Sequence, residues 1–179
     1  MTRISSGLMA VITVVLAVVG GAAIAGQDRY TLQVPNGLAF SEFKGYERWQ
    51  VVAVSQAESL NLIEVIVANP VMIEAYQAGI PGNGKPFPDG AKMAKIHWNA
   101  IKSPEAPAPT IVPGTLHDID LMVRDSKRFA NTGSWGYAEF DYDASSDTFK
   151  PLGKGADCGY ACHTIVAKKD YVFTAYPKR

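Results

Sequence analysis

The chain has 179 residues, and its 17 basic and 17 acidic side chains give a formal net charge of zero at pH 7. No basic stripe breaks this balance, which argues against nucleic acid as a partner. Hydrophobic residues make up 47% of the chain and only two residues are cysteines. The composition therefore indicates one domain that builds an ordinary apolar core without disulfide staples.

The N-terminus has the pattern of an export signal. A short basic start at residues 1–3 precedes an almost wholly apolar run at residues 8–19, and Ala23-Ile24-Ala25 is a small-x-small cleavage pattern. The stretch 8–25 could just span a bilayer if it stayed uncut. The small-residue end and the single basic residue favour cleavage after Ala25. We therefore expect a periplasmic, soluble mature protein formed by residues 26–179.

The rest of the chain alternates between strand patterns and short helix patterns. Asn69 and Pro70 are typical of a helix start, and Gly79 is typical of a helix end. Short links between strand patterns favour antiparallel pairing. The expected fold is α+β, a mostly antiparallel sheet of about five strands with flanking short helices. In chain order, the sequence predicts strands at 49–54 and 61–68, a helix at 71–78, a strand at 92–98, an irregular connection at 103–113, a strand at 116–123, a short helix at 125–130 and a strand at 135–142. Strand character returns at residues 171–176, after the five strands of this count.

Two of these strand patterns place acidic residues on defined faces. In the strand at 116–123, Asp118, Asp120 and Met122 fall on one side. In the strand at 135–142, Glu139 shares a face with Tyr137. On a regular strand Lys92 and Lys95 point to opposite sides, so only one of them can reach a buried group.

The most informative segment is Cys158-Gly159-Tyr160-Ala161-Cys162-His163, which contains both cysteines. A cysteine pair followed at once by histidine is typical of covalent haem attachment, with two thioether links and an axial imidazole. On a helix, the two cysteines lie four residues apart and share a face. We expect such a helix, with Asp157 as its N-cap and Lys168 and Lys169 near its C-terminal end.

Two alternatives remain open for this cysteine pair. Cysteines of exported proteins usually form disulfides, although a bridge across one turn of helix fits the S–S torsion poorly. A Cys-x3-Cys pair can also bind copper or serve another redox use. The histidine that follows directly favours haem.

Three ordered blocks resemble the cytochrome P-460 family and its relative cytochrome c′-beta. The first is Phe87-Pro88-Asp89-Gly90 with Lys95 after it, and the second runs over residues 124–131 with Trp135 after it. The third is the Cys-x3-Cys-His element with Lys169-Asp170-Tyr171-Val172-Phe173-Thr174. The resemblance covers roughly residues 49–176. The spacer of three residues between the cysteines departs from the more common two.

The resemblance implies haem c bound through Cys158 and Cys162, with His163 as the iron ligand and the other axial position open. It also implies a homodimer. Lys95 matches the lysine that P-460 enzymes bond to the porphyrin ring, and Asp120 aligns with an acidic pocket position. Glu139 is a further candidate for proton transfer.

One position departs from the enzymes. Glu64 stands where they carry an arginine. This departure bears on the polarity of the distal pocket, and hence on activity.

Three functions are consistent with this pattern. The first is a redox enzyme that oxidises hydroxylamine or nitric oxide and passes electrons to a soluble cytochrome, as the resemblance implies. The second is a haem protein of the c′-beta kind that binds nitric oxide or carbon monoxide without turnover. The third is an electron carrier in which His97 or His117 supplies a sixth iron ligand. Of these, the sequence favours the enzyme.

Overall fold

A computed structural model describes residues 26–35, 37–153 and 156–179. The predicted signal peptide at residues 1–25 lies outside these described residues. Among the helices of the described part, none is both long and apolar enough to cross a membrane.

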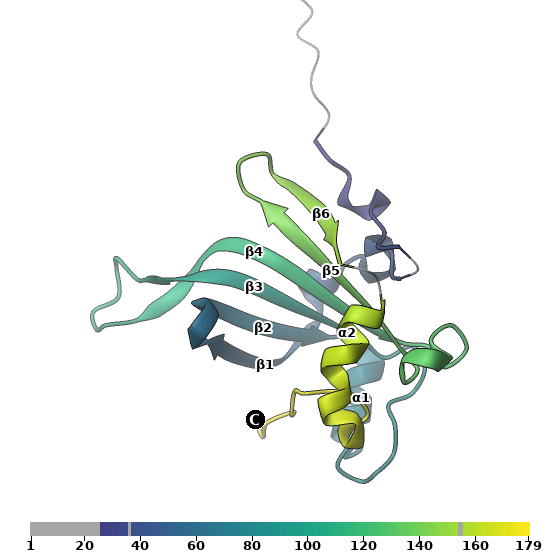
Figure 1. The fold of residues 1–179 in the computed structure, drawn as a ribbon. Coiled ribbons are helices and arrows are strands. Elements are labelled where there is room, and N and C mark those ends of the chain that lie inside the picture. Colours follow the sequence, from purple (N-terminus) through teal and green to yellow (C-terminus); the bar gives the residue numbers. More distant parts are fainter. Residues whose placement is uncertain (1–25, 36, 154–155) are drawn as a thin grey trace, which may run out of the picture.

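The described chain is built on one antiparallel sheet in which each strand pairs with the next along the sequence (Figure 1). Most of the connections between consecutive strands are short, which favours this simple order. The exception is the segment at residues 69–91, which contains a helix. The α+β class is confirmed, with six strands rather than about five. The strands are β1 (Gln50–Ala57), β2 (Leu62–Ala68), β3 (Lys92–Lys102), β4 (Ile111–Arg124), β5 (Trp135–Asp143) and β6 (Thr148–Leu152).

The strand that the sequence analysis missed is β6, at one edge of the sheet. It has only five residues and includes Pro151, which cannot donate a ladder hydrogen bond. An edge strand tolerates proline because one of its sides needs no partner. The predicted irregular connection at 103–113 is also too long, since β4 already begins at Ile111.

Short helices flank the sheet. Asn69 caps α1 as predicted, because its side chain accepts a hydrogen bond from the Met72 N–H at 3.1 Å. Two helices are α-helical, α1 (Pro70–Gln77) and α2 (Ala156–His163), and the 3₁₀-helices are η1 (Arg29–Thr31), η2 (Phe40–Phe43), η3 (Tyr46–Arg48), η4 (Glu58–Leu60), η5 (Ala130–Thr132) and η6 (Thr164–Lys169).

Two local predictions were wrong. Residues 125–130 do not form a helix. The Asp125 carboxylate accepts the N–H groups of Lys127 and Arg128, and the Phe129 N–H donates to the Asp125 backbone oxygen, but this single turn is not continued. Residues 171–176 do not form a strand. Asp170 and Tyr171 adopt left-handed backbone conformations, with φ of 51° and 62°, and turn the chain away from an extended path.

The two faces of the sheet differ in character. One face carries apolar rows such as Val65–Ile96–Ile119–Phe140, and it packs against Phe40 of the N-terminal segment. The opposite face carries α2 at one end (Figure 1). Along that face the side chains change from apolar, beneath α2, to charged, farther from it.

Candidate functional site

Helix α2 lies directly on β5, and Gly159 makes this approach possible. A Cβ atom at position 159 would lie 2.5 Å from Cγ of Tyr137, closer than real Cβ contacts allow. Glycine is therefore required in the spacer between the cysteines because the helix packs against an aromatic ring of the sheet. The predicted helix is present, but Asp157 lies in its first turn and not at the N-cap, since α2 begins at Ala156.

Cys158 and Cys162 are free thiols, and both are exposed. They lie four residues apart on α2, so they share one face of the helix. The structure thus brings together two thiols that are available for a covalent link.

His163, the last residue of α2, is held in a defined orientation. Its Nδ1 is 2.6 Å from the backbone oxygen of Tyr171 and donates to it. The imidazole ring lies between the rings of Tyr137 and Phe173, with centroids 4.9 Å away in both cases. Among the described residues, no hydrogen bond to Nε2 is formed. A histidine whose Nδ1–H is bound to a carbonyl presents Nε2 to a metal.

The environment of His163 also favours the neutral imidazole that metal binding needs. Burial lowers the pKa of His163, and the positive charge of Lys95 lowers it further, against the hydrogen bond to Tyr171. His163 packs against Tyr137 of β5, and Tyr137 lies on the same sheet face as Glu139 and its cross-strand neighbours Asp120 and Lys95.

The turn that carries the Tyr171 carbonyl is fixed from two sides. The Arg124 guanidinium donates to both carboxylate oxygens of Asp170, at 2.9 and 3.1 Å, and the Phe87 N–H donates to the same carboxylate at 2.7 Å. Two consecutive non-glycine residues with positive φ need such support. Arg124 and Asp170 therefore act on His163 through the backbone of Tyr171.

The three sequence blocks behind the family resemblance meet at this place. Asp89 of the first block accepts hydrogen bonds from the N–H and the hydroxyl of Ser126 in the second block, at 2.9 and 2.6 Å. Phe87 and Arg124 join the same two blocks to Asp170 of the third. The blocks are thus parts of one framework behind α2.

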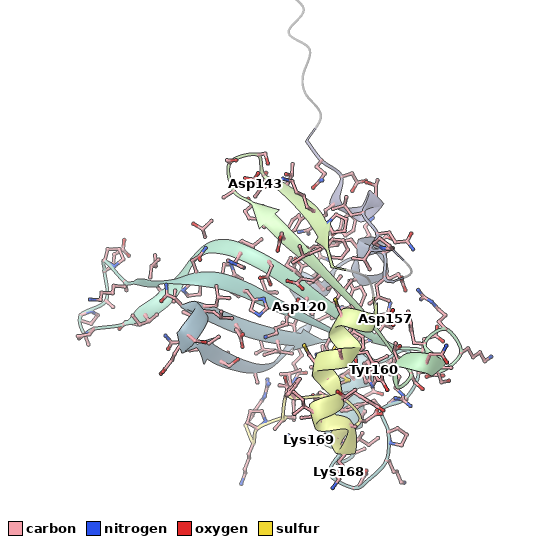
Figure 2. All side chains as sticks on the ribbon, in the orientation of Figure 1. Asp120, Asp143, Asp157, Tyr160, Lys168 and Lys169 are labelled. Carbon is pink, nitrogen blue, oxygen red and sulfur yellow. The ribbon has the colours of Figure 1, made fainter. Side chains whose placement is uncertain are left out.

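The sheet residues predicted for the site lie in one row. Lys95 of β3 pairs with Asp120 of β4, and Asp120 pairs with Glu139 of β5. The prediction that Asp118, Asp120 and Met122 share a face is right, and Lys92 points to the other side, where its Nζ donates to the Glu42 backbone oxygen. Figure 2 shows Asp120 on the sheet beside α2.

Asp120 is the side chain with the most perturbed acidity in this row. Burial raises its pKa to about 7, the nearby charges of Asp118 and Glu139 add to this rise, and His97 and Lys95 oppose it. The pKa of Glu139 is raised as well, by burial first and then by Asp118. A carboxyl group with a pKa near 7 can both take and release a proton at neutral pH.

A second charged row continues the site away from α2. Glu64 of β2 binds the Lys95 ammonium at 2.9 Å, accepts the Ser55 hydroxyl at 2.6 Å and faces His97 Nε2 at 3.3 Å. His97, which is buried, contacts Asp118 through its other ring nitrogen. His97 is therefore a satisfied buried histidine, flanked by carboxylates on both sides.

The contact between Glu64, His97 and Asp118 was not predicted from the sequence, which marked Glu64 only as a departure from the family. Strand alternation places each of these residues on a face of its own strand. The register that aligns the three strands cannot be read from the pattern of one strand.

The residues around α2 fit a covalently bound haem. Two free thiols share a helix face, and an oriented imidazole with an available Nε2 follows the second of them. Phe173, which packs against His163, leaves 46% of its surface exposed, an apolar area that a bound macrocycle can cover. The two thiols and the imidazole come from one helix that packs against an antiparallel sheet. This arrangement is that of a haem protein.

The family comparison agrees with that class. The family model Cytochrome P460 matches residues 43–174, which is most of the chain. The chain belongs to the cytochrome P460 family and is a c-type haem protein of that family. No curated protein matches the sequence.

Proposed function

We propose that this protein is a redox enzyme of the cytochrome P460 kind, which oxidises hydroxylamine or nitric oxide and passes the electrons to a soluble cytochrome. The observation that carries the proposal is Asp120, a carboxyl group with a pKa of about 7 on the sheet face that also carries α2. Hydroxylamine loses protons together with electrons. A proton acceptor near neutrality on that face is what this chemistry needs.

The haem would be held by Cys158 and Cys162 through thioether links, with His163 as the axial ligand. The bound iron would supply the redox chemistry. The residues of this chain would do the rest: Tyr171 orients His163, and Asp120 accepts a proton released by the substrate. Glu139 would help to keep Asp120 partly protonated, since like charges raise the pKa of a neighbouring acid.

Lys95 would face the ring from β3, where the family resemblance puts the cross-linking lysine. Its place in one row with Asp120 and Glu139, on the sheet face that His163 packs against through Tyr137, supports this position. In the structure its ammonium group is bound to Glu64 at 2.9 Å. A bond between Lys95 and the porphyrin would require the side chain to leave that ion pair.

The compartment and the partners complete the proposal. Covalent haem attachment outside the cytoplasm would follow export by the N-terminal segment, and a soluble cytochrome would accept the electrons. A homodimer is expected from the family resemblance alone.

A second function has a specific observation in its favour. Glu64 stands where the family resemblance puts an arginine, and it binds the Lys95 ammonium. Lys95 would then stay in this ion pair and not bond to the porphyrin, and the wall of the pocket would be more acidic. This arrangement favours a protein that binds nitric oxide or carbon monoxide without turnover. A sixth ligand from His97 is less suitable, because carboxylates face both of its ring nitrogens.

One experiment separates these functions. The mature protein is produced in a host that attaches haem, and a denaturing pyridine assay checks for covalent haem. Hydroxylamine oxidation is then measured for the wild type and for Asp120→Asn with an artificial electron acceptor. Turnover that falls by about 100-fold in the variant supports the enzyme.

The control is Asp143→Asn, at the exposed end of the β5–β6 hairpin (Figure 2). It should leave turnover unchanged. Reversible nitric oxide binding without any turnover would replace the first proposal by the second, and a low-spin spectrum with no open site would contradict both.

A further inference from the structure

A chain of titratable groups leads from Asp120 to the protein surface. The carboxylate of Asp118 stands in the middle of it: one oxygen contacts His97 Nδ1, and the other lies 2.5 Å from His117 Nδ1. One ligand atom each of His97, Asp118 and Asp120 lie within 4.8 Å of one another. A single water can span such a gap between two carboxyl groups.

The two ends of this chain differ in exposure. The side chains of His97 and Asp118 are 7% and 8% exposed, whereas that of His117 is 47% exposed. His117 also borders an open surface hollow, which Asp141, Asp143 and Lys150 line as well. Asp118 therefore connects a buried group to a histidine that reaches solvent.

We propose that His117 is the proton exit of the distal pocket, reached from Asp120 through Asp118. This inference rests on the proposed function, because it assigns the fate of the protons that Asp120 accepts. The half-exposed imidazole of His117 has two ring nitrogens, so it can take a proton on the one that faces Asp118 and release a proton from the other to buffer.

The step moves a proton and no electrons. The O–H bond of protonated Asp120 breaks, and its proton passes by way of one water to the Asp118 carboxylate. The half-exposed His117 ring first exchanges with buffer, losing the proton of Nδ1, which is hydrogen-bonded to Asp118, and gaining one on Nε2. Nδ1 then takes the proton of Asp118, and Nε2 releases its own proton to buffer. His117 and Asp118 both end in the protonation state in which they began.

The surroundings favour an ionised Asp118 between transfers. Burial alone would raise its pKa, but hydrogen bonds from His97 and His117 outweigh burial and lower it. For His97 the signs are reversed: burial alone would lower its pKa, but the hydrogen bond to Asp118 outweighs burial and raises it. Asp118 thus passes a proton on and does not store it. The charged groups of this cluster are Glu64 of β2, Lys95 and His97 of β3, His117 and Asp120 of β4, and Glu139 and Asp141 of β5.

The test compares the holoprotein with its His117→Gln variant. Reduction of the haem makes the pocket more negative, so protons are taken up near pH 7, and a pH-indicator dye follows this uptake in a stopped-flow instrument. In dilute buffer we expect His117→Gln to slow proton uptake at least about fivefold. Phosphate, a proton donor that need not bind the iron, should restore the rate.

The matched control is Asp143→Asn, which changes a charge at the same surface hollow but does not touch Asp118. It should take up protons as the wild type does. The haem spectrum of His117→Gln should also be unchanged, because position 117 is exposed.

The outcomes separate this inference from the proposed function. Slower proton uptake in His117→Gln, with no hydroxylamine turnover in the wild type, would contradict the enzymatic function and support the exit route. Hydroxylamine turnover in the wild type, with equal uptake rates of wild type and His117→Gln in dilute buffer, would contradict the exit route and support the enzymatic function. A wild type that takes up no proton near pH 7 would also overturn the route.

Discussion

The two sides of the proposed haem site are built in different ways. On the proximal side, His163 and both cysteines come from a single helix, and a partly buried ion pair, Arg124–Asp170, supports the turn behind them. On the distal side, the charged groups come from neighbouring strands, and the pKa of Asp120 depends on the charges of several of its neighbours. Removing a proximal group should therefore change binding and stability, while removing a distal group should change acidity.

The largest effect is expected from the thiols. Replacing both Cys158 and Cys162 by serine removes both thioether donors, so no haem should remain covalently attached. The measurement is extraction of haem into acidic organic solvent after purification. Asp120→Asn provides the distal comparison and should keep all its haem. Haem that resists extraction in the double variant would contradict the attachment site.

The second-largest effect is expected when the Arg124–Asp170 ion pair behind His163 is broken. Arg124→Gln leaves Asp170 with a partly buried, unpaired carboxylate, and we expect a loss of about 3 kcal/mol in the free energy of unfolding. The vibration of the iron–histidine bond should shift as well, because the Tyr171 carbonyl loses its support.

The control for this change is Arg128→Gln, which breaks an exposed pair with Glu42. Such pairs contribute about 1 kcal/mol or less. Equal losses in the two variants would show that the Arg124–Asp170 pair has no special role.

A smaller proximal effect is expected at Gly159. Alanine improves helix propensity by about 1 kcal/mol, but its Cβ would meet the Tyr137 ring at 2.5 Å. Overpacking of this severity costs about 3 kcal/mol, so the clash outweighs the propensity. We expect a net loss of about 2 kcal/mol, or about 4–8 °C in Tm. Ala161→Ser, at an exposed position of the same helix, should change Tm little.

The distal side should respond mainly in its pH dependence. The folded pKa of Asp120 is raised from 3.8 to about 7, so between these values the folded protein holds a proton that the unfolded chain has lost. Stability from this group is thus present at low pH and is lost as the pH rises through about 7.

Asp120→Asn should remove that part of the pH dependence of unfolding. Denaturant titrations at several pH values would measure it, with Asp143→Asn as the control. Parallel stability curves for the wild type and Asp120→Asn would contradict a raised pKa at this position.

Local sequence patterns were enough for much of the molecule. A run of β-branched residues predicted β2 closely, strand alternation predicted β5 closely, and Asn69 with Pro70 marked the start of α1. The predictions failed where the expected pattern was too short or was interrupted by tertiary contacts. Residues 125–130 make one turn that is not continued into a helix. Arg124 binds Asp170 in a turn at the place where a strand was expected to begin.

By itself, the sequence predicted the proximal residues of the proposed haem site, because Cys158, Cys162 and His163 are neighbours on one helix. The orientation of the His163 ring comes from the tertiary contacts of Tyr171 and Tyr137. The sequence also placed Lys95, Asp120 and Glu139 on strands, but it did not pair them. Only the tertiary structure set the register that aligns these residues, joined Glu64 to Lys95 and connected Asp118 to His97 and His117. The physical reason is that acidity depends on burial and on charges from other strands, whereas a helical motif carries its geometry within its own residues.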